Sequence, residues 1–177
     1  MNEYLIIDDF FSNPDFVRKT ALNATFYTKD NHPGNIGHFP GYRTNYINEW
    51  NDDLYKLMLN TQISCVEQLL NHKLSEKFTE YWTKFSFSWT DKNTPIQEHR
   101  DFTDNWNGFT NFYGGVIYLT PNPPENSGTI LTGINTIKNK YNRYVMYDAT
   151  KLHSVESSFG EDINDGRLVL THFIFLK

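Results

Sequence analysis

The pattern of hydrophobic and polar residues changes near residue 77 of the chain. Before that point, the segments 14–24 and 52–71 place their apolar residues mostly on one helical face. An apolar run at 4–7 precedes them and predicts a short strand. From 77 to 176 the chain instead consists of short apolar or alternating runs separated by polar turns, which is typical of β-strands. The sequence therefore predicts a helical first part and a β-rich second part.

Local signals mark where the two helices begin. Ser12 or Asn13 can cap the first helix, and Pro14 suits its first position because the N–H that proline lacks has no partner there. Asp52 and Asp53 favour the N-terminus of the second helix. The expected apolar face of the second helix consists of Leu54, Leu57, Met58, Cys65, Leu69 and Leu70.

The β-rich part predicts the fold class. Its expected strands are 78–89, 112–120, 129–131, 143–147, 151–155 and 167–176, with an excursion at 134–142. Two helices followed by these strands indicate a mainly β protein, a double-stranded β-helix (jelly-roll, cupin-like) with helices that buttress one sheet. We expect a single domain over 1–177, in which 1–76 is helical support and loop and 77–177 is the jelly-roll core.

Composition narrows the class of protein. A chain of 177 residues is long enough for one domain with a real core, and its 14 Phe, 11 Tyr and 4 Trp favour β structure. The net charge of −5 and the lack of a basic block argue against nucleic-acid binding. We see no secretory signal and no apolar run of about 18 residues, so we expect no membrane segment. The single cysteine, Cys65, excludes an internal disulfide and a thiolate zinc cluster, and it favours a reducing, cytoplasmic location.

A His-x-Asp motif at 99–101 is the first candidate for chemistry. Residues two apart in an extended segment point to the same side, so His99 and Asp101 can hold one metal ion. Such a pair arises by chance roughly 0.4 times in this composition, so the motif needs support from elsewhere. His153, which follows a predicted strand, offers a second imidazole. Two histidines and one carboxylate with open positions suit non-haem Fe(II) used for oxygen chemistry. The alternative is that His153 is a buried histidine bonded to a backbone carbonyl.

Arg167 strengthens the hypothesis of a site. It opens an otherwise apolar strand 14 residues after His153, and a charge that enters a barrel unpaired is costly. The distal carboxylate of a dicarboxylic acid is a suitable partner, because a guanidinium binds it as a bidentate fork. Strand alternation puts Arg167, Val169 and Thr171 on one face and His172 on the other, so we reject His172 as a metal ligand.

The order of these motifs resembles the Fe(II)/2-oxoglutarate-dependent dioxygenases, and within them the prolyl-4-hydroxylase-like branch, which includes small phage members. The matching residues are His-x-Asp at 99–101, Val-Ile-Tyr-Leu-Thr at 116–120, Gly-Thr at 128–129, Tyr-Val-Met-Tyr-Asp at 144–148, His153 and Arg-Leu-Val-Leu-Thr at 167–171. The resemblance implies that His99, Asp101 and His153 are the catalytic iron ligands. It also implies that Arg167 binds the distal carboxylate of 2-oxoglutarate as co-substrate. A phage-encoded member would act in the host cytoplasm.

Two positions depart from the family pattern. Val169 stands where a hydroxyl residue often follows the arginine by two positions, and the usual upstream strand tyrosine has no match among Phe85, Phe87 and Trp89. We consider Tyr118 and Thr129 as substitutes in binding the co-substrate.

Two functions from different classes fit these residues. The first is a dioxygenase that hydroxylates a peptide, an amino acid or another small substrate, with release of succinate and CO2. Asp101 then favours hydroxylation over halogenation, since it leaves no room for a halide on the metal. The alternative is a non-catalytic jelly-roll module that holds a metal such as zinc. Arg167 favours the enzyme, because a binding module needs no buried cation there.

The long segment at 29–45 is the candidate substrate-binding loop. Its glycines and prolines make regular structure improbable, and loops of this length in compact domains are often functional. We expect it to border the metal pocket and to order over a substrate, although a static connector has the same composition. Arg43 and Tyr42 in this loop, and Trp106 after the His-x-Asp motif, are the expected substrate contacts.

Overall fold

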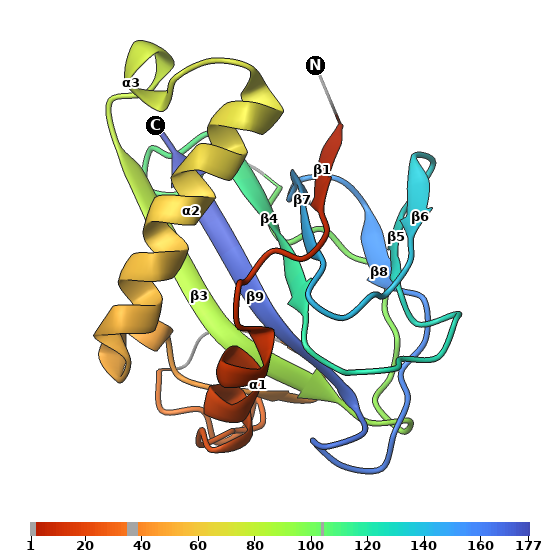
Figure 1. The fold of residues 1–177 in the computed structure, drawn as a ribbon. Coiled ribbons are helices and arrows are strands. Elements are labelled where there is room, and N and C mark those ends of the chain that lie inside the picture. Colours follow the sequence, from red (N-terminus) through yellow and green to blue (C-terminus); the bar gives the residue numbers. More distant parts are fainter. Residues whose placement is uncertain (1–2, 35–38, 104) are drawn as a thin grey trace.

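The structure, a computed structural model, describes residues 3–34, 39–103 and 105–177. These residues form two antiparallel sheets, with the helices packed against the larger one (Figure 1). The larger sheet has the strand order β1-β7-β4-β9-β3-β2, and the smaller sheet has the order β6-β5-β8. The protein is thus mainly β with supporting helices, as the sequence predicts.

Long antiparallel strands form the centre of the larger sheet. Its strands are β1 (Tyr4–Ile7), β2 (Tyr42–Arg43), β3 (Tyr81–Thr90), β4 (Asn111–Tyr118), β7 (Tyr144–Asp148) and β9 (Arg167–Leu176). The smaller sheet consists of β5 (Thr129–Leu131), β6 (Asn135–Ile137) and β8 (His153–Val155). β9 pairs along its whole length with β3 and also pairs with β4, so it lies between them and is one of the two central strands.

The helices begin where polar side chains bond to the free backbone N–H groups. Before α1 (Pro14–Leu22), the side chain of Asn13 accepts a hydrogen bond from the N–H of Phe16 at 3.1 Å, so Asn13 rather than Ser12 is the cap. Asn51 caps α2 (Asp52–Leu70) in the same way. The shorter helices are η1 (Ile47–Glu49) and α3 (Leu74–Lys77).

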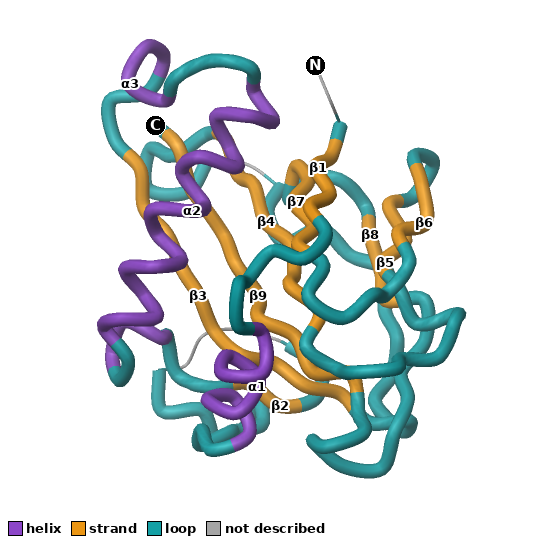
Figure 2. The backbone as a smooth tube through the Cα atoms, in the orientation of Figure 1, coloured by secondary structure: helices purple, strands orange, loops and turns teal. Residues whose placement is uncertain are grey.

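α2 lies across the outer face of the larger sheet (Figures 1 and 2). Its buried residues, including Leu54, Met58, Val66 and Leu69, share one core cluster with Phe85 and Phe87 of β3 and Leu168, Leu170 and Ile174 of β9. Leu57 corrects the predicted helix face. It is 51% exposed, because it lies about 100° round the helix from the fully buried Met58. The helix therefore covers one face of these strands, while their other face is turned to the smaller sheet and the pocket.

Two short strands lie where the sequence predicts none. β2 falls inside the loop at 29–45 and pairs with Trp89 and Ser88 of β3 (Figure 2). β6 falls inside the excursion at 134–142 and pairs with β5. Both are edge strands of two or three residues, so the pairing partner stabilises them more than any pattern of their own.

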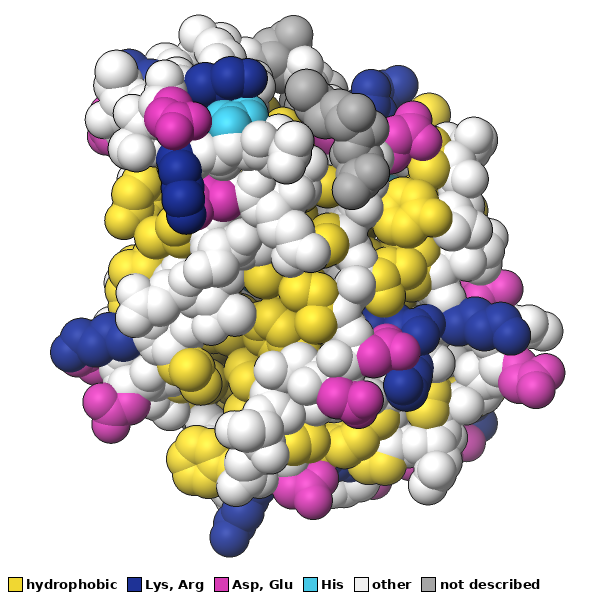
Figure 3. All heavy atoms as spheres, turned by 45° about the horizontal axis from the view of Figure 1, so that its top comes forward, with side chains coloured by type: hydrophobic (Ala, Val, Ile, Leu, Met, Phe, Trp, Pro, Cys, Tyr) yellow, Lys and Arg dark blue, Asp and Glu magenta, His cyan; other side chains and the backbone are white. Residues whose placement is uncertain are grey.

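The surface carries mixed charge. On the face shown in Figure 3, lysine and arginine side chains lie near aspartate and glutamate side chains, and neither sign covers the face alone. None of the helices in the described residues is both long enough and apolar enough to cross a membrane.

Candidate metal centre and its pocket

Backbone hydrogen bonds bring the two histidine segments together. His99 and His153 form an isolated antiparallel bridge, in which each N–H donates to the other's carbonyl at 2.9 Å. The N–H of Asp101 donates to the carbonyl of Ala149 at 3.1 Å. The His-x-Asp segment therefore lies alongside the start of β8 even though the two histidines are far apart in the chain.

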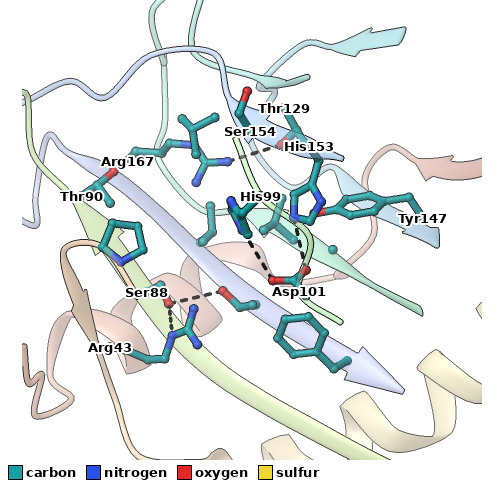
Figure 4. A pocket seen from close by; sticks show the side chains of 17 residues that line it. Arg43, Ser88, Thr90, His99, Asp101, Thr129, Tyr147, His153, Ser154 and Arg167 are labelled. Atoms are coloured by element: carbon teal, nitrogen blue, oxygen red, sulfur yellow. Dashed lines mark hydrogen bonds and ion pairs between the residues drawn. The ribbon is translucent and has the colours of Figure 1, made fainter. Parts of the chain in front are cut away.

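The three predicted ligand side chains converge (Figure 4). Asp101 Oδ1 lies 3.5 Å from His99 Nε2, and Asp101 Oδ2 lies 3.2 Å from His153 Nε2. One ligand atom from each residue can be chosen so that all lie within 4.8 Å of one another. Bonds of about 2.0–2.2 Å, the range for zinc with nitrogen or oxygen ligands, place neighbouring donors roughly 3 Å apart, close to the two distances from Asp101. Among the described residues, this is the one such group of three histidine, cysteine or acidic residues.

The other ring nitrogen of each histidine fixes its tautomer. His99 Nδ1 lies 2.9 Å from the carbonyl oxygen of Gln97, and His153 Nδ1 lies 2.9 Å from that of Lys151. A carbonyl oxygen can only accept, so Nδ1 must carry the proton in both neutral rings. Each Nε2 lone pair is then directed at the common centre, which is the usual arrangement of metal-binding histidines. The donor set therefore fits a divalent metal ion.

Asp101 provides the negative charge of this centre. Burial disfavours its ionised form, but when the two rings are protonated and no metal is bound, hydrogen bonds and positive charge from His153 and His99 outweigh burial and lower the pKa of Asp101 to about 2. Asp101 is therefore an anion at neutral pH.

Arg167 lies in the same pocket as these three residues and is 5% exposed. Its Nη2 lies 3.5 Å from Thr129 Oγ1, which in turn lies 2.7 Å from the hydroxyl of Tyr118. The guanidinium carbon lies 5.5 Å from the centre of the Tyr118 ring. Within the described part of the chain, no carboxylate lies within 4.0 Å of this guanidinium, and its Nε is buried without a hydrogen-bond partner. A buried cation of this kind calls for an anionic ligand.

The alternation predicted for β9 is confirmed. Val169, Thr171 and Phe173 line the pocket together with Arg167, while His172 points to the opposite side. There its Nε2 lies 2.9 Å from the carbonyl oxygen of Val145, and burial lowers its pKa to about 4. His172 is thus a neutral core residue on the face covered by α2.

The three expected substrate contacts lie in different places. Arg43 lines the pocket, and so does Pro40 from the same loop, whereas residues 35–38 lie outside the described residues. Tyr42 stacks on Trp89, with ring centres 4.3 Å apart, and does not line the pocket. Trp106 is also absent from the lining. It stacks on Trp82, with ring centres 5.2 Å apart.

Several lining residues escape sequence reasoning. The ring of Tyr147 lies 4.8 Å from that of His153, and burial holds the pKa of this phenol well above its ordinary value. Ser88 bonds to Arg43 across the β2–β3 pair. The run that precedes His153 contains Tyr147, so strand alternation could have placed it. Ser88 needs the pairing of β2, which the local pattern does not show.

Comparison with solved structures assigns the fold. A Pseudomonas putida prolyl-4-hydroxylase aligns with 100% of this chain and 93% of its own, at 14% identity and a TM-score of 0.63. HygX from Streptomyces hygroscopicus, solved with nickel and 2-oxoglutarate bound, aligns over 98% of this chain and 83% of its own at 10% identity and a TM-score of 0.66. This chain has the double-stranded β-helix fold of 2-oxoglutarate-dependent oxygenases.

Other oxygenase-fold structures agree with this assignment. EctD from S. alaskensis, solved with 2-oxoglutarate and 5-hydroxyectoine, gives a TM-score of 0.66 at 14% identity, over 98% of this chain and 72% of its own. No protein-family model and no curated protein sequence matches the chain. Because sequence identity is this low, the likeness establishes the double-stranded β-helix, and the chemistry must be argued from the pocket.

Proposed function

We propose that the protein is an Fe(II)- and 2-oxoglutarate-dependent dioxygenase that hydroxylates a peptide, an amino acid or another small substrate, with release of succinate and CO2. The observation that carries the proposal is the presence in one pocket of a two-histidine, one-carboxylate centre and a buried guanidinium that has no carboxylate partner within the described ranges. The three-residue centre is suited to bind Fe(II), and the guanidinium is suited to bind the distal carboxylate of 2-oxoglutarate.

The residues of the centre have distinct roles in this proposal. His99 and His153 would bind the metal through Nε2, since each Nδ1 proton is held by a backbone carbonyl. Asp101 would offset part of the metal charge and occupy the position that a halide would need, which favours hydroxylation. When bound, Fe(II) supplies the activation of O2 that accompanies decarboxylation of 2-oxoglutarate.

The residues around Arg167 would hold the co-substrate. Its guanidinium can donate two parallel hydrogen bonds to the distal carboxylate of 2-oxoglutarate. We infer that Thr129 contributes a further donor, because its hydroxyl lies between Arg167 and Tyr118 and lines the pocket. Tyr118 supports this arrangement from behind, fully buried below the guanidinium.

The test separates the enzyme from a metal-binding jelly-roll module. Nickel-loaded protein is titrated with 2-oxoglutarate and with 2-oxobutyrate, which lacks the distal carboxylate, and binding is followed by calorimetry. The dioxygenase predicts tight binding of 2-oxoglutarate only, and slow formation of succinate when Fe(II) and O2 replace nickel. Metal binding without preference for 2-oxoglutarate would favour the binding module.

We further propose that residues 1–177 act as a single domain, with 1–76 supporting the core at 77–177, and that the protein works in the cytoplasm. Cys65 is a free, buried thiol, and burial raises its pKa to about 11. A free thiol of this kind is compatible with a reducing compartment.

A further inference from the structure

A second arginine faces the candidate metal centre from the edge of the larger sheet (Figure 4). Arg43 lies on β2, where it pairs with Ser88 of β3. Its Nε donates to Ser88 Oγ at 3.0 Å, and the hydroxyl of Thr171 lies 3.3 Å from the same oxygen. The guanidinium carbon also lies 4.8 Å from the centre of the Phe39 ring. These contacts hold Arg43 in a fixed orientation at the pocket.

Among the described residues, no hydrogen-bond acceptor is bonded to the terminal nitrogens of Arg43. Within the described residues, the guanidinium donates one hydrogen bond, through Nε, and no carboxylate lies within 4.0 Å of it. Burial lowers the pKa of Arg43 from its ordinary value, while the charge of Asp101 opposes that change. An arginine remains protonated at neutral pH even under such a shift, so it is a cation in the pocket.

The charges of the described lining residues leave Arg43 without a counter-ion. Asp101 is the only acidic residue among the described residues of the lining, which also include Arg43 and Arg167. Under the proposed function, the two arginines and a divalent ion bring four positive charges, while Asp101 and 2-oxoglutarate bring three negative charges. In this count, Arg167 would neutralise the distal carboxylate of 2-oxoglutarate, and the metal ion would neutralise its other carboxylate together with Asp101. One positive charge remains, and it belongs to Arg43.

We propose that Arg43 binds a carboxylate of the substrate, so that the substrate is a carboxylic acid, such as a peptide whose free carboxyl group enters the pocket. This inference rests on the proposed function and narrows its substrate class. A carboxylate carries the single charge that the pocket lacks, and its two oxygens match the planar fork of a guanidinium. A phosphate monoester would bring about 1.5 to 2 negative charges and leave the pocket with an excess of negative charge.

Acetate is the simplest probe of this site, and acetamide is its neutral counterpart. Protein loaded with zinc, which is diamagnetic and accepts the same nitrogen and oxygen ligands, and with 2-oxoglutarate is titrated with each compound while the ¹⁵N NMR signal of Arg43 Nε is followed. We expect acetate to shift this signal in a saturable way, with a dissociation constant on the order of 1–10 mM, and acetamide to bind at least about tenfold more weakly. Arg43→Gln should lose acetate binding, as measured by calorimetry. Arg143→Gln, which changes an arginine paired with Asp8 outside the pocket, should keep it.

Three results would overturn the proposal. They are absence of a saturable acetate shift, acetate binding that survives in Arg43→Gln, and tighter binding of methyl phosphate than of acetate.

A further measurement separates this inference from the proposed function. Arg43→Gln should bind 2-oxoglutarate within about threefold of the parent protein. If its affinity falls as far as in Arg167→Ala, Arg43 belongs to the co-substrate site and the substrate assignment is wrong, while the proposed enzyme class stands. A parent protein that binds neither nickel nor 2-oxoglutarate would refute the enzyme class itself.

Discussion

At the scale of single residues, the chemistry depends on how few charges the pocket contains. Asp101 is the one anion among its described lining residues, and each histidine reaches the centre through a tautomer fixed by a backbone carbonyl. Sequence spacing was enough to propose His99, Asp101, His153 and Arg167, because a metal centre and a buried cation need residue types that rarely occur in apolar strands. It could not find the partners of Arg43, since those depend on the register of a two-residue strand.

Removal of Asp101 tests the metal site. We predict that Asp101→Ala weakens nickel or Fe(II) binding by more than the roughly 10–100-fold that loss of an outer-shell partner costs, because the sole anionic ligand disappears. Anaerobic calorimetry measures the change. Asp30→Ala, which removes an exposed carboxylate paired with Lys29, should bind metal like the parent protein. Equal metal affinity in both variants would place the metal elsewhere.

Substitution of Arg167 tests the co-substrate site. Arg167→Ala should leave metal binding intact and weaken 2-oxoglutarate binding by about 2–5 kcal/mol, the cost of truncating one partner of a buried charged contact. Arg167→Lys keeps the charge but loses the fork, so its affinity should fall between those of the parent and the alanine variant. If 2-oxoglutarate binds Arg167→Ala as tightly as the parent, the guanidinium has another ligand.

At the scale of elements, α2 and β9 show what supports the pocket from behind. The alternation of β9 divides pocket residues from core residues, and it was predictable because a long strand between two environments has a period of two. The exposure of Leu57 was less predictable, because the sequence of a helix with apolar residues on more than one side does not determine which side is buried. Packing of α2 against β3 and β9 decides it.

Two neighbouring residues of α2 provide a matched test of this packing. Met58 is fully buried, so Met58→Ala should lower the free energy of unfolding by about 2–5 kcal/mol through lost contacts and a cavity. Leu57 is 51% exposed, and Leu57→Ala should change the same free energy by no more than about 0.5 kcal/mol. Urea unfolding measures both. Equal losses in the two variants would show that the helix packs in another rotation.

The buried His172 predicts how stability depends on pH. Its pKa is about 4 in the folded protein against 6.5 for an ordinary histidine, because burial disfavours the charged ring. The unfolded chain therefore binds more protons between these values, and stability is lost as pH falls from 6.5 towards 4. The full effect is about 3 kcal/mol, since one pKa unit corresponds to about 1.4 kcal/mol.

His172→Gln should flatten this part of the profile, because a neutral amide can still donate to the carbonyl of Val145. Urea unfolding at a series of pH values measures the slope for both proteins. A variant whose slope equals that of the parent would show that other groups cause the acid sensitivity.

At the scale of the whole molecule, the site depends on contacts between distant parts of the chain. The sequence predicts a double-stranded β-helix from its run of strands, and that fold class is confirmed. The strand order was not predictable, since β1 and β2 lie at opposite edges of a sheet whose two central strands, β4 and β9, come from the second half of the sequence. Local patterns specify strands, whereas pairing depends on long-range packing.

Metal binding should therefore stabilise the fold. A ligand that binds only the folded state adds about 2.7 kcal/mol when its concentration is 100 times its dissociation constant. We predict that nickel raises the melting temperature of the parent protein in a concentration-dependent way and has little effect on Asp101→Ala. Differential scanning calorimetry provides the measurement, and an equal rise in both proteins would point to nonspecific binding.

The central position of β9 also has a consequence for synthesis of the protein. The ribosome synthesises β3 and β4 well before β9. However, β3 and β4 do not pair with each other, and each pairs with β9, which lies between them (Figure 1). Until β9 emerges, the nascent chain therefore exposes two long unpaired strand edges, which are the surfaces that lead to aggregation. Arg167 opens this same strand, so the larger sheet and the proposed co-substrate site are completed by the same late segment.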